Sequence, residues 1–374
     1  MSCMSRYLHG LGWGVVALAA AVALVSLRPP LTMQPFVAQV VALRTFMTLG
    51  WGLLGLLLLA TALLRRRLAR SRAGRASSSS RAGLRTGALG LVLVLVALAH
   101  GGVLLGRGMS LGPLETSDTS SDTPSDKAAF TVMSLNTERE DAPVQAVAET
   151  ARAVQADVVV LPETTAAYGE ELAGLLRGAA GELTVYTAVS PPYGWNDEDG
   201  DGADDDSGAH HGIDPVRATT VLVSERLGGY RQTEGVAGAG RGMVVLEPVD
   251  GSGPVITGVH TYPPVPGLMG EWRSSLTTVA GLCQDPPEGL VMVGDFNATR
   301  DHALLRDLHA CASAGEQAGV GGLATWPTHT GTRLLGATID HVLVDASAWV
   351  GQSGEVLTLP QTDHRAVVVR LGKA

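Results

Sequence analysis

The sequence predicts an α/β domain that follows three membrane-spanning helices. Three apolar stretches fill most of the first 106 residues, and the rest of the chain alternates short β-branched runs with amphipathic stretches. Charge divides in the same way: residues 1–114 hold twelve Arg and none of the 36 acidic residues, so they carry +12 and the remainder carries −21. Such a division of charge argues against a single soluble globular domain. A hydrophobic content of 45% excludes a disordered or collagen-like chain.

Each apolar stretch is long enough to cross a bilayer. The stretches cover residues 8–27, 45–64 and 86–106, and their only ionisable side chains are His9 and His100. About 20 helical residues span the roughly 30 Å hydrocarbon core. A cleaved signal peptide is an alternative for the first stretch, but no small-residue cleavage pattern follows it. We therefore expect a membrane domain over residues 1–109 with three transmembrane helices.

Arginines in the loops predict how the helices are oriented. Eight Arg and no acid lie between the second and third stretches, whereas the first loop holds two Arg. Loops rich in Arg and Lys stay in the cytoplasm. A nucleic-acid-binding patch is an alternative, but a topology determinant that contacts anionic headgroups is the simpler interpretation. We expect a multi-pass protein of the cell membrane with a cytoplasmic N-terminus and an extracytoplasmic acidic domain.

Two polar segments lie beyond the helices. Residues 110–127 are rich in Ser, Thr, Asp and Pro, which predicts a flexible linker, so the outer domain covers residues 128–374. Residues 196–214 contain eight acids and predict an exposed loop. Its Asp197, Asp199 and Asp201 match the opening of a calcium loop, but position twelve is Gly208 rather than Glu. A solvated acidic loop is therefore favoured over a calcium site.

The outer domain has the pattern of a mixed sheet with helices. Strands are expected at 130–135, 157–161, 219–223, 243–246, 255–259, 290–293, 339–344 and 366–371, and helices at 142–155, 166–177, 270–283 and 302–312. Some consecutive strands have no helix between them, which predicts antiparallel pairing beside parallel pairing. Cys283 and Cys311 fall in the expected oxidising exterior, where a disulfide and two reduced buried thiols are about equally compatible with the sequence.

Polar residues stand where these strands begin or end, which is where a parallel or mixed sheet presents its site. They are Asn136, Glu163, His260, Asp295, Asn297, Asp340, Asp363 and His364. Singly, each has a structural interpretation as a turn former, helix cap, satisfied histidine or salt bridge. Together, their carboxylate and amide oxygens suit Mg²⁺ or Mn²⁺ rather than zinc. Hydrolysis of a phosphate ester needs such a hard cation, a base for water and support for the departing alkoxide.

Taken in order, the motifs LN, PET, GVH, GDFN, IDH and TDH resemble the endonuclease/exonuclease/phosphatase superfamily. This superfamily of divalent-metal phosphoesterases includes DNase I-like nucleases, sphingomyelinases and inositol-phosphate phosphatases. The resemblance covers residues 128–372, and GDFN and the final DHR are its most specific motifs. It implies a four-layer α/β/β/α sandwich, DNase I-like, with a metal-dependent hydrolase site.

The resemblance also implies a role for each site residue. Asn136, Glu163 and Asp363 would bind the metal, Mg²⁺ or Mn²⁺. His364 would be the general base or a charge-stabilising imidazole, oriented by Asp340, while His341 would be structural. Asp295 would orient the attacking water, Asn297 would hold a phosphate oxygen, and His260 would bond to the phosphoryl group. Many relatives add a Tyr or Arg between the PET and GVH motifs; no residue of this sequence matches it clearly, and Arg217 and the nearby Tyr262 are candidates.

The substrate is predicted from charge and location. A nuclease gathers Lys and Arg to bind a polyanion, whereas the domain after residue 114 carries −21. Tethering to a bilayer raises the effective concentration of lipid phosphates without positive charge. We therefore expect a phospholipid or lipid-linked phosphate substrate, with an extracellular nuclease as the alternative. A non-catalytic receptor or adhesin is the alternative of another class, although a binding module needs no such complete set of polar residues. The layout also resembles bacterial membrane-bound members associated with glycopeptide (teicoplanin) resistance, which implies a cell-envelope role.

Overall fold

The computed structural model describes residue 14 and residues 29–71, 78–112, 129–178, 182–191 and 213–374. The chain divides into two compact units: Met1–Gly106 with Asp301–Ala303, and Arg107–Arg300 with Leu304–Ala374. Most of the predicted linker and most of the predicted acidic loop, residues 196–214, lie outside the described residues.

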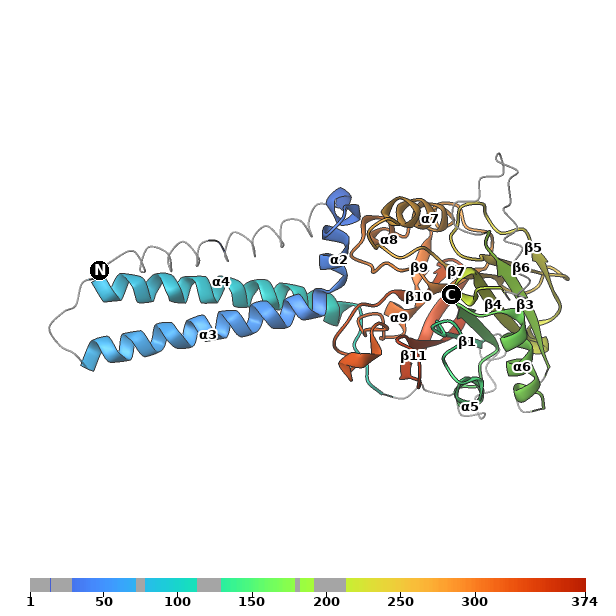
Figure 1. The fold of residues 1–374 in the computed structure, drawn as a ribbon, viewed down its shortest axis with the longest axis horizontal. Coiled ribbons are helices and arrows are strands. Elements are labelled where there is room, and N and C mark those ends of the chain that lie inside the picture. Colours follow the sequence, from blue (N-terminus) through green and yellow to red (C-terminus); the bar gives the residue numbers. More distant parts are fainter. Residues whose placement is uncertain (1–13, 15–28, 72–77, 113–128, 179–181, 192–212) are drawn as a thin grey trace, which may run out of the picture. The chain divides into compact units, whose positions relative to one another are not determined.

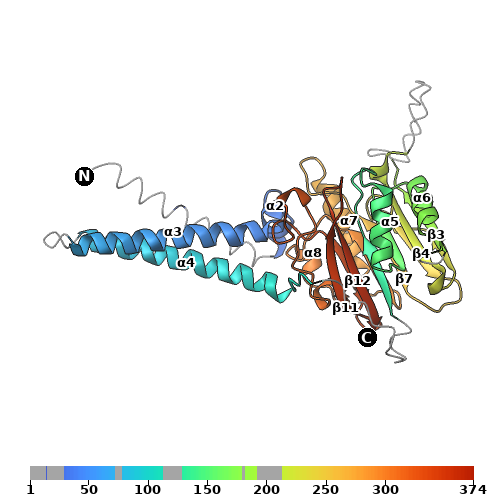
Figure 2. The ribbon, with the colours of Figure 1, turned by 90° about the horizontal axis from the view of Figure 1, so that it is seen from below.

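The first unit contains two long helices that lie side by side (Figures 1 and 2). Its elements are η1 (Pro29–Met33), α2 (Val37–Ala42), α3 (Arg44–Ser71) and α4 (Ser78–Gly106). α3 and α4 approach closely because both have glycine at the contact: a Cβ at Gly55 would lie 2.8 Å from the Gly90 carbonyl oxygen. Within this unit the buried Arg44 donates from Nε to the Asp301 carboxylate at 2.8 Å.

Among the described residues, two helical stretches are long and apolar enough to cross a membrane, Arg44–Leu68 and Gly83–Gly106. They contain the second and third predicted spans. The first predicted span, residues 8–27, lies outside the described residues except for Gly14. Length and composition thus support two candidate spans, and the third stays a prediction.

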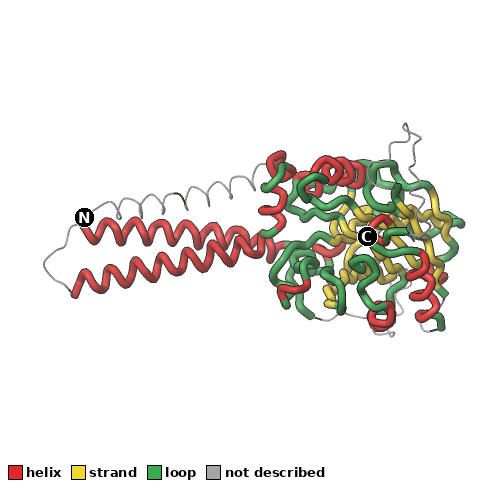
Figure 3. The backbone as a smooth tube through the Cα atoms, in the orientation of Figure 1, coloured by secondary structure: helices red, strands yellow, loops and turns green. Residues whose placement is uncertain are grey.

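The second unit is built on two six-stranded mixed sheets (Figure 3). The first sheet runs β11 (Trp349–Thr358), β12 (Arg365–Lys373), β1 (Phe130–Ser134), β2 (Val158–Pro162), β4 (Ala218–Ser224), β3 (Leu183–Val189). The second runs β5 (Tyr230–Thr233), β6 (Val244–Pro248), β7 (Val255–His260), β8 (Leu290–Asp295), β10 (Asp340–Asp345), β9 (Cys311–Ser313). Among the described strands, the pairs β1 with β2 and β7 with β8 are the parallel ones, and a helix crosses between the members of each pair.

Helices cover the sandwich. They are α5 (Val144–Ala153), α6 (Ala166–Leu176), α7 (Met269–Gly281), α8 (Ala303–Arg306) and α9 (Ala314–Gln317), with short 3₁₀ turns η3 (Pro215–Arg217), η4 (Glu225–Leu227) and η5 (Thr328–Thr330). One apolar cluster joins the facing sides of the sheets, with Val132 and Val160 from the first and Val293 from the second. A second cluster lies between the first sheet and α5 and α6, which occupy the side of the sandwich opposite α7 (Figure 1). These layers confirm the predicted α/β sandwich with two mixed sheets.

The expected elements are present with one correction. All eight expected strands and the first three expected helices of this unit lie within two residues or so of their predicted bounds. The expected helix at 302–312 is wrong after Arg306. The Asp307 carboxylate accepts a hydrogen bond from the His309 N–H at 3.0 Å, and the chain turns at His309 with φ of 52°. Cys311 then begins β9 instead of continuing a helix.

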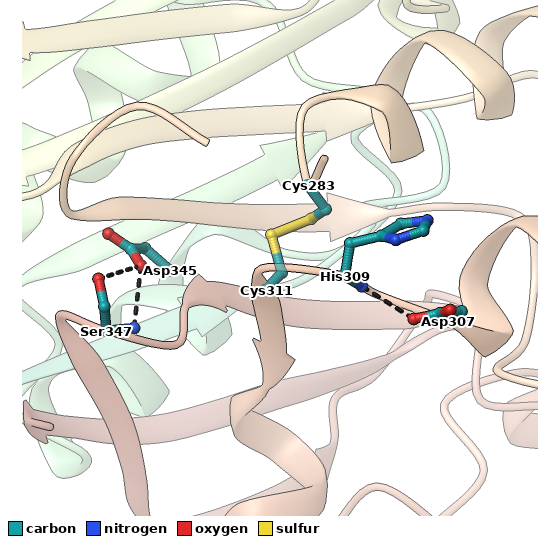
Figure 4. Close-up of a disulfide and its surroundings, with 6 residues drawn as sticks. All are labelled: Cys283, Asp307, His309, Cys311, Asp345 and Ser347. Atoms are coloured by element: carbon teal, nitrogen blue, oxygen red, sulfur yellow. Dashed lines mark hydrogen bonds between the residues drawn. A yellow bond between two sulfur atoms is a disulfide. The ribbon is translucent and has the colours of Figure 1, made fainter. Parts of the chain in front are cut away.

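Cys283 and Cys311, whose state the sequence leaves open, form a disulfide (Figure 4). Their Cα atoms lie 5.2 Å apart, although 28 positions separate them in sequence. The disulfide ties the segment after α7 to the start of β9. It therefore constrains the two segments on either side of the GDFN motif along the chain.

Candidate active site

The predicted site residues lie close together because they stand at or next to strand ends, and these ends lie at the same edge of the sheets. Asp295 ends β8, where it lies in register with His260, the last residue of parallel β7. Asp340 also pairs in register with Asp295, because β10 runs antiparallel and begins where β8 ends. In the other sheet, Asn136 lies two residues after the end of β1, and Glu163 directly follows β2. His364 immediately precedes β12, which pairs antiparallel with β1, so it lies at that same edge.

His364 and Asp340 form a buried pair. His364 Nδ1 lies 2.9 Å from Asp340 Oδ2, and the two residues are 6% and 1% exposed. The other ring nitrogen, Nε2, lies 3.8 Å from Asp295 Oδ2 and 3.8 Å from Asp363 Oδ1. Burial by itself lowers the pKa of His364, but the charges of Asp340 and Asp295 outweigh it and raise that pKa to about 10. The ring is therefore an imidazolium that faces two further carboxylates.

Asp295 is held by amide groups on both carboxylate oxygens. Oδ1 accepts a hydrogen bond from the Asn297 N–H at 2.7 Å, and Oδ2 accepts one from Asn136 Nδ2 at 3.1 Å. Burial and the charge of Asp340 raise the pKa of Asp295 to about 7. Asn297 Nδ2 donates to the Thr261 carbonyl at 2.9 Å and to Asp295 at 3.3 Å, so both of its amide hydrogens orient the site. Its predicted contact with a phosphate oxygen stays a prediction.

Glu163 lies on the other side of Asn136. Asn136 Nδ2 donates to Glu163 Oε1 at 3.3 Å, while Asn136 Oδ1 accepts from the Glu138 N–H at 2.9 Å. Glu163 has a left-handed backbone with φ of 57°, and the Thr137 hydroxyl donates to its carbonyl at 2.9 Å. Asn136 therefore donates hydrogen bonds from Nδ2 to both Glu163 and Asp295. Its role as a metal ligand stays a prediction.

His260 is a neutral histidine in this arrangement. It is 1% exposed, and its Nε2 lies 3.7 Å from Glu163 Oε1. Burial, followed by the charges of Arg241 and His364, lowers the pKa of His260 well below its ordinary value. Within the described part of the chain, Nδ1 is buried without a hydrogen-bond partner. A neutral imidazole next to Glu163 is able to donate one hydrogen bond to a phosphoryl group.

Arg241 belongs to the site although the sequence analysis did not single it out. Its guanidinium lies over the Tyr262 ring, 5.2 Å from the ring centroid, and its backbone N–H donates to the His260 carbonyl at 2.6 Å. No described residue forms an ion pair or a hydrogen bond with the guanidinium, whereas the Thr219 hydroxyl donates to the Arg241 carbonyl at 2.9 Å. Of the two predicted candidates, Tyr262 supports Arg241, whereas Arg217 donates from Nε to the Ser190 carbonyl at 2.9 Å.

A sequence signal for Arg241 exists in the glycines beside it. A Cβ at Gly240 would lie 2.3 Å from the His260 carbonyl oxygen, and one at Gly242 would lie 2.3 Å from the Ala188 carbonyl oxygen. Both glycines have positive φ, 120° and 75°, which other residues rarely adopt. The Gly-Arg-Gly sequence therefore lets the backbone of Arg241 approach both sheets at the rim of the site.

Space for a substrate lies beside Asp363. A cavity of about 540 Å³ is lined by Glu138, Asp141, Thr328, His329, Gln361, Thr362 and Asp363. The side chain of Asp363 is 40% exposed, compared with 16% for Glu163 and 2% for Asp295. Asp363 is thus the site carboxylate that solvent and solutes reach most easily.

The donor set fits a hard divalent cation. Oxygen and nitrogen atoms of Asp295, Asp340 and His364 lie within 4.8 Å of one another, and Glu163 and Asp363 flank this group. The raised pKa of Asp295 reflects carboxylates crowded in a buried space, which a bound cation relieves. Nδ1 of His364 bonds to Asp340, and the raised pKa of His364 keeps Nε2 protonated, so the carboxylate oxygens are the available ligands.

The fold and this site define a phosphoester hydrolase of the two-sheet sandwich class. The chain belongs to the endonuclease/exonuclease/phosphatase family, whose model matches residues 133–364. Members are metal-dependent phosphoester hydrolases, so the protein is an enzyme of this type. No curated protein matches the chain in sequence.

Several solved structures are similar to this chain. A humanized form of TDP2 from D. rerio is 14% identical, with 65% of this chain and 99% of that chain covered and a TM-score of 0.48. A protein of the same family from Beutenbergia cavernae is 17% identical, with coverage of 66% and 72% and a TM-score of 0.46. An AP endonuclease from Archaeoglobus fulgidus is 10% identical, with coverage of 64% and 98% and a TM-score of 0.41.

Proposed function

We propose that the protein is a Mg²⁺- or Mn²⁺-dependent phosphoesterase that acts outside the cytoplasmic membrane on a phospholipid or a lipid-linked phosphate. The observation that carries the chemistry is the line of contacts from Asp340 through His364 to Asp295, with Glu163 connected to Asp295 by Asn136. This line supports a site in which a cationic imidazole, a carboxylate of raised pKa and oxygens able to bind a metal act on one phosphate group.

Glu163 and Asp363 would hold the metal, with Asn136 beside them. A bound divalent cation neutralises non-bridging phosphate oxygens and makes water a better nucleophile. Oε1 of Glu163 lies close to Asn136 and His260, and Oδ1 of Asp363 lies close to His364. These contacts keep the two carboxylates in place before a substrate arrives.

Asp295 would orient the attacking water and accept its proton. Hydrogen bonds from the Asn297 N–H and from Asn136 Nδ2 hold its carboxylate in place, and it would take the proton as the water oxygen bonds to phosphorus. The bond from phosphorus to the leaving oxygen then breaks, and solvent protonates the departing alkoxide. His364 donates from Nε2 to a phosphoryl oxygen on which charge grows, while Asp340 stabilises the imidazolium.

Arg241 and His260 complete phosphate binding in this proposal. The guanidinium of Arg241 is a cation with no acidic partner among the described residues, and it lies close enough to lower the pKa of His260. An Arg free to form two parallel hydrogen bonds suits a phosphate group. The neutral His260 donates to the same group from the Glu163 side of the site.

Three features support action outside the membrane. The eight Arg of residues 65–85, which include the end of α3 and the start of α4, favour a cytoplasmic location, and residues after 106 would then lie on the other side. Two helices meet the length and apolarity of membrane spans. The Cys283–Cys311 disulfide is typical of proteins in oxidising compartments.

Charge supports a lipid phosphate over nucleic acid. Neutralisation of nucleic-acid phosphates by Lys and Arg supplies most of the nonspecific affinity of a nuclease for its substrate. A domain with a net negative charge offers little such neutralisation. A single phosphate group needs only Arg241, His260 and His364. Attachment to the bilayer then supplies the high local concentration of substrate.

The test uses the full chain reconstituted in liposomes that contain lipid phosphates, with Mg²⁺ and a soluble phosphodiester or DNA as parallel substrates. A protease site inserted within residues 113–126 allows the tether to be cut after reconstitution. We expect cutting to reduce the rate on lipid far more than the rate on the soluble diester, since only the former depends on local concentration. A nuclease would lose little, and its rate would fall steeply with salt. Metal binding without hydrolysis of any substrate would favour the receptor or adhesin alternative.

A further inference from the structure

The two carboxylate oxygens of Asp363 are not equivalent. Oδ2 accepts a hydrogen bond from the indole Nε1 of Trp326 at 2.7 Å, whereas Oδ1 lies 3.8 Å from His364 Nε2. Its backbone N–H donates to Glu138 Oε2 at 2.6 Å. An exposed carboxylate ordinarily rotates about its side-chain bonds, and here the indole opposes that rotation.

Trp326 is itself held firmly through its backbone. It pairs with Ala337 in a short bridge, in which the Ala337 N–H donates to the Trp326 carbonyl at 2.7 Å and the Trp326 N–H donates back at 3.0 Å. Gly336 has φ of 141°, and a Cβ there would lie 2.2 Å from the Trp326 carbonyl oxygen. The glycine therefore permits the close approach that fixes the backbone of Trp326.

Arg365 anchors the chain on both sides of Trp326. Its Nη1 donates to the Ala324 carbonyl at 3.2 Å and to the Pro327 carbonyl at 3.1 Å. Arg365 is 1% exposed and directly follows His364 in sequence. Trp326 is consequently fixed relative to β12, which His364 immediately precedes.

We propose that Trp326 is a positioning residue for the metal site. By occupying Oδ2 of Asp363, its N–H leaves Oδ1 as the one oxygen turned towards the metal, and it sets the direction of that oxygen before the metal binds. This inference rests on the metal ligand role of Asp363 in the proposed function. Partners that orient a ligand in this way alter metal affinity by about 10- to 100-fold when they are removed.

The experiment measures Mn²⁺ affinity of the full chain in detergent by calorimetry, without substrate. Trp326→Phe removes the N–H and keeps an aromatic ring, so we expect Mn²⁺ affinity to fall about 10- to 100-fold. Trp349→Phe is the matched control, because its indole donates to the Gly289 carbonyl at 3.0 Å away from the site residues. This control is expected to bind Mn²⁺ as the wild type does.

Two further variants separate positioning from general damage. In an Asp363→Asn background, Trp326→Phe should add no further loss of affinity, because the ligand on which it acts is already gone. Trp326→His keeps an N–H donor and should restore most of the affinity, which also tests the inference if Trp326→Phe folds poorly. In assays, the Mn²⁺ concentration for half-maximal rate should rise in Trp326→Phe while kcat at saturating Mn²⁺ changes little.

The outcomes are distinct. Unchanged Mn²⁺ affinity in Trp326→Phe, or an equal loss with and without Asp363, overturns the positioning role and leaves the proposed function intact. A wild-type protein that binds no Mn²⁺ contradicts the metal site of the proposed function and this inference with it.

Discussion

His364 donates its Nδ1 hydrogen to Asp340 across 2.9 Å, and this bond turns Nε2 towards Asp295 and Asp363. Asp340 and Asp295 are register partners on neighbouring strands, so the sheet itself fixes the spacing of the two carboxylates around the imidazole. The histidine comes from the opposite sheet, immediately before β12. Catalytic geometry therefore depends on the packing of the two sheets against each other.

Asp340→Asn tests the role of this pair. An amide in place of the carboxylate removes the charge that keeps His364 cationic, so we expect kcat to fall about 100-fold or more. Mn²⁺ affinity should change little, because Asp340 is not among the proposed ligands. Phosphoesterase assays and calorimetry on the same preparation make the measurement. A variant with wild-type kcat would show that the pair has no catalytic role.

Arg241→Met tests phosphate binding. Loss of the unpaired cation should raise KM at least tenfold, and Arg241→Lys should recover part of the affinity, since it restores charge but not the planar guanidinium. Arg231→Met is the control, because Arg231 is a surface residue paired with Glu247 at 2.7 Å. Steady-state kinetics on a soluble phosphodiester give KM for each variant. Equal effects of the Arg241 and Arg231 substitutions would exclude a specific phosphate contact.

His341 gives a prediction about pH and stability. Burial lowers its pKa to about 4, and its Nε2 lies 2.8 Å from the Ala298 carbonyl oxygen. Between pH 6.5 and 4 the unfolded chain takes up a proton that the folded protein does not, so stability falls as pH falls through this window. His341→Gln keeps an amide donor that does not titrate. From pH 7 to 4.5 the wild type should lose about 2 kcal/mol more than His341→Gln in denaturant unfolding. Parallel pH profiles for the two proteins would contradict this assignment.

Reporter fusions test the topology. A reporter that is active only outside the cytoplasm should be active when fused after Gly106 and silent when fused at Ser78, because the Arg-rich residues 65–85 favour the cytoplasm. A cytoplasmic reporter at the same two positions is the control and should give the reverse pattern. Activity of the exterior reporter at Ser78 alone would reverse the orientation.

Much of the fold was predictable because its central strands are apolar runs bounded by Gly, Pro or polar residues. β1, β2 and β8 are buried along their whole length, and such runs have a strong signal. β3 was missed because it lies at a sheet edge with most positions only half-buried. β11 was missed because Gly351 and Gly354 interrupt it, and the register shifts between Gly351 and Ser353.

The site was predictable where a motif ends a strand, and not where a residue comes from a loop. Glu163 and Asp295 follow strong strand signals. Arg241 lies in a Gly-rich loop before β6, and its proximity to His260 follows from the pairing of β6 with β7, which sequence alone does not define. Trp326 approaches Asp363 through tertiary contacts, among them the bridge with Ala337 and the hydrogen bonds of Arg365.

In the proposed mechanism this family member hydrolyses phosphoesters with a metal, Asp295 and His364. The most direct measurement is turnover of a soluble phosphodiester by the purified full chain, with Mg²⁺ and with EDTA, for the wild type, Asp295→Ala and His364→Ala. We expect metal-dependent turnover by the wild type and a loss of about 100-fold or more in each variant that still unfolds cooperatively. Wild-type turnover that survives EDTA, or rates in both folded variants equal to the wild-type rate, would contradict the account.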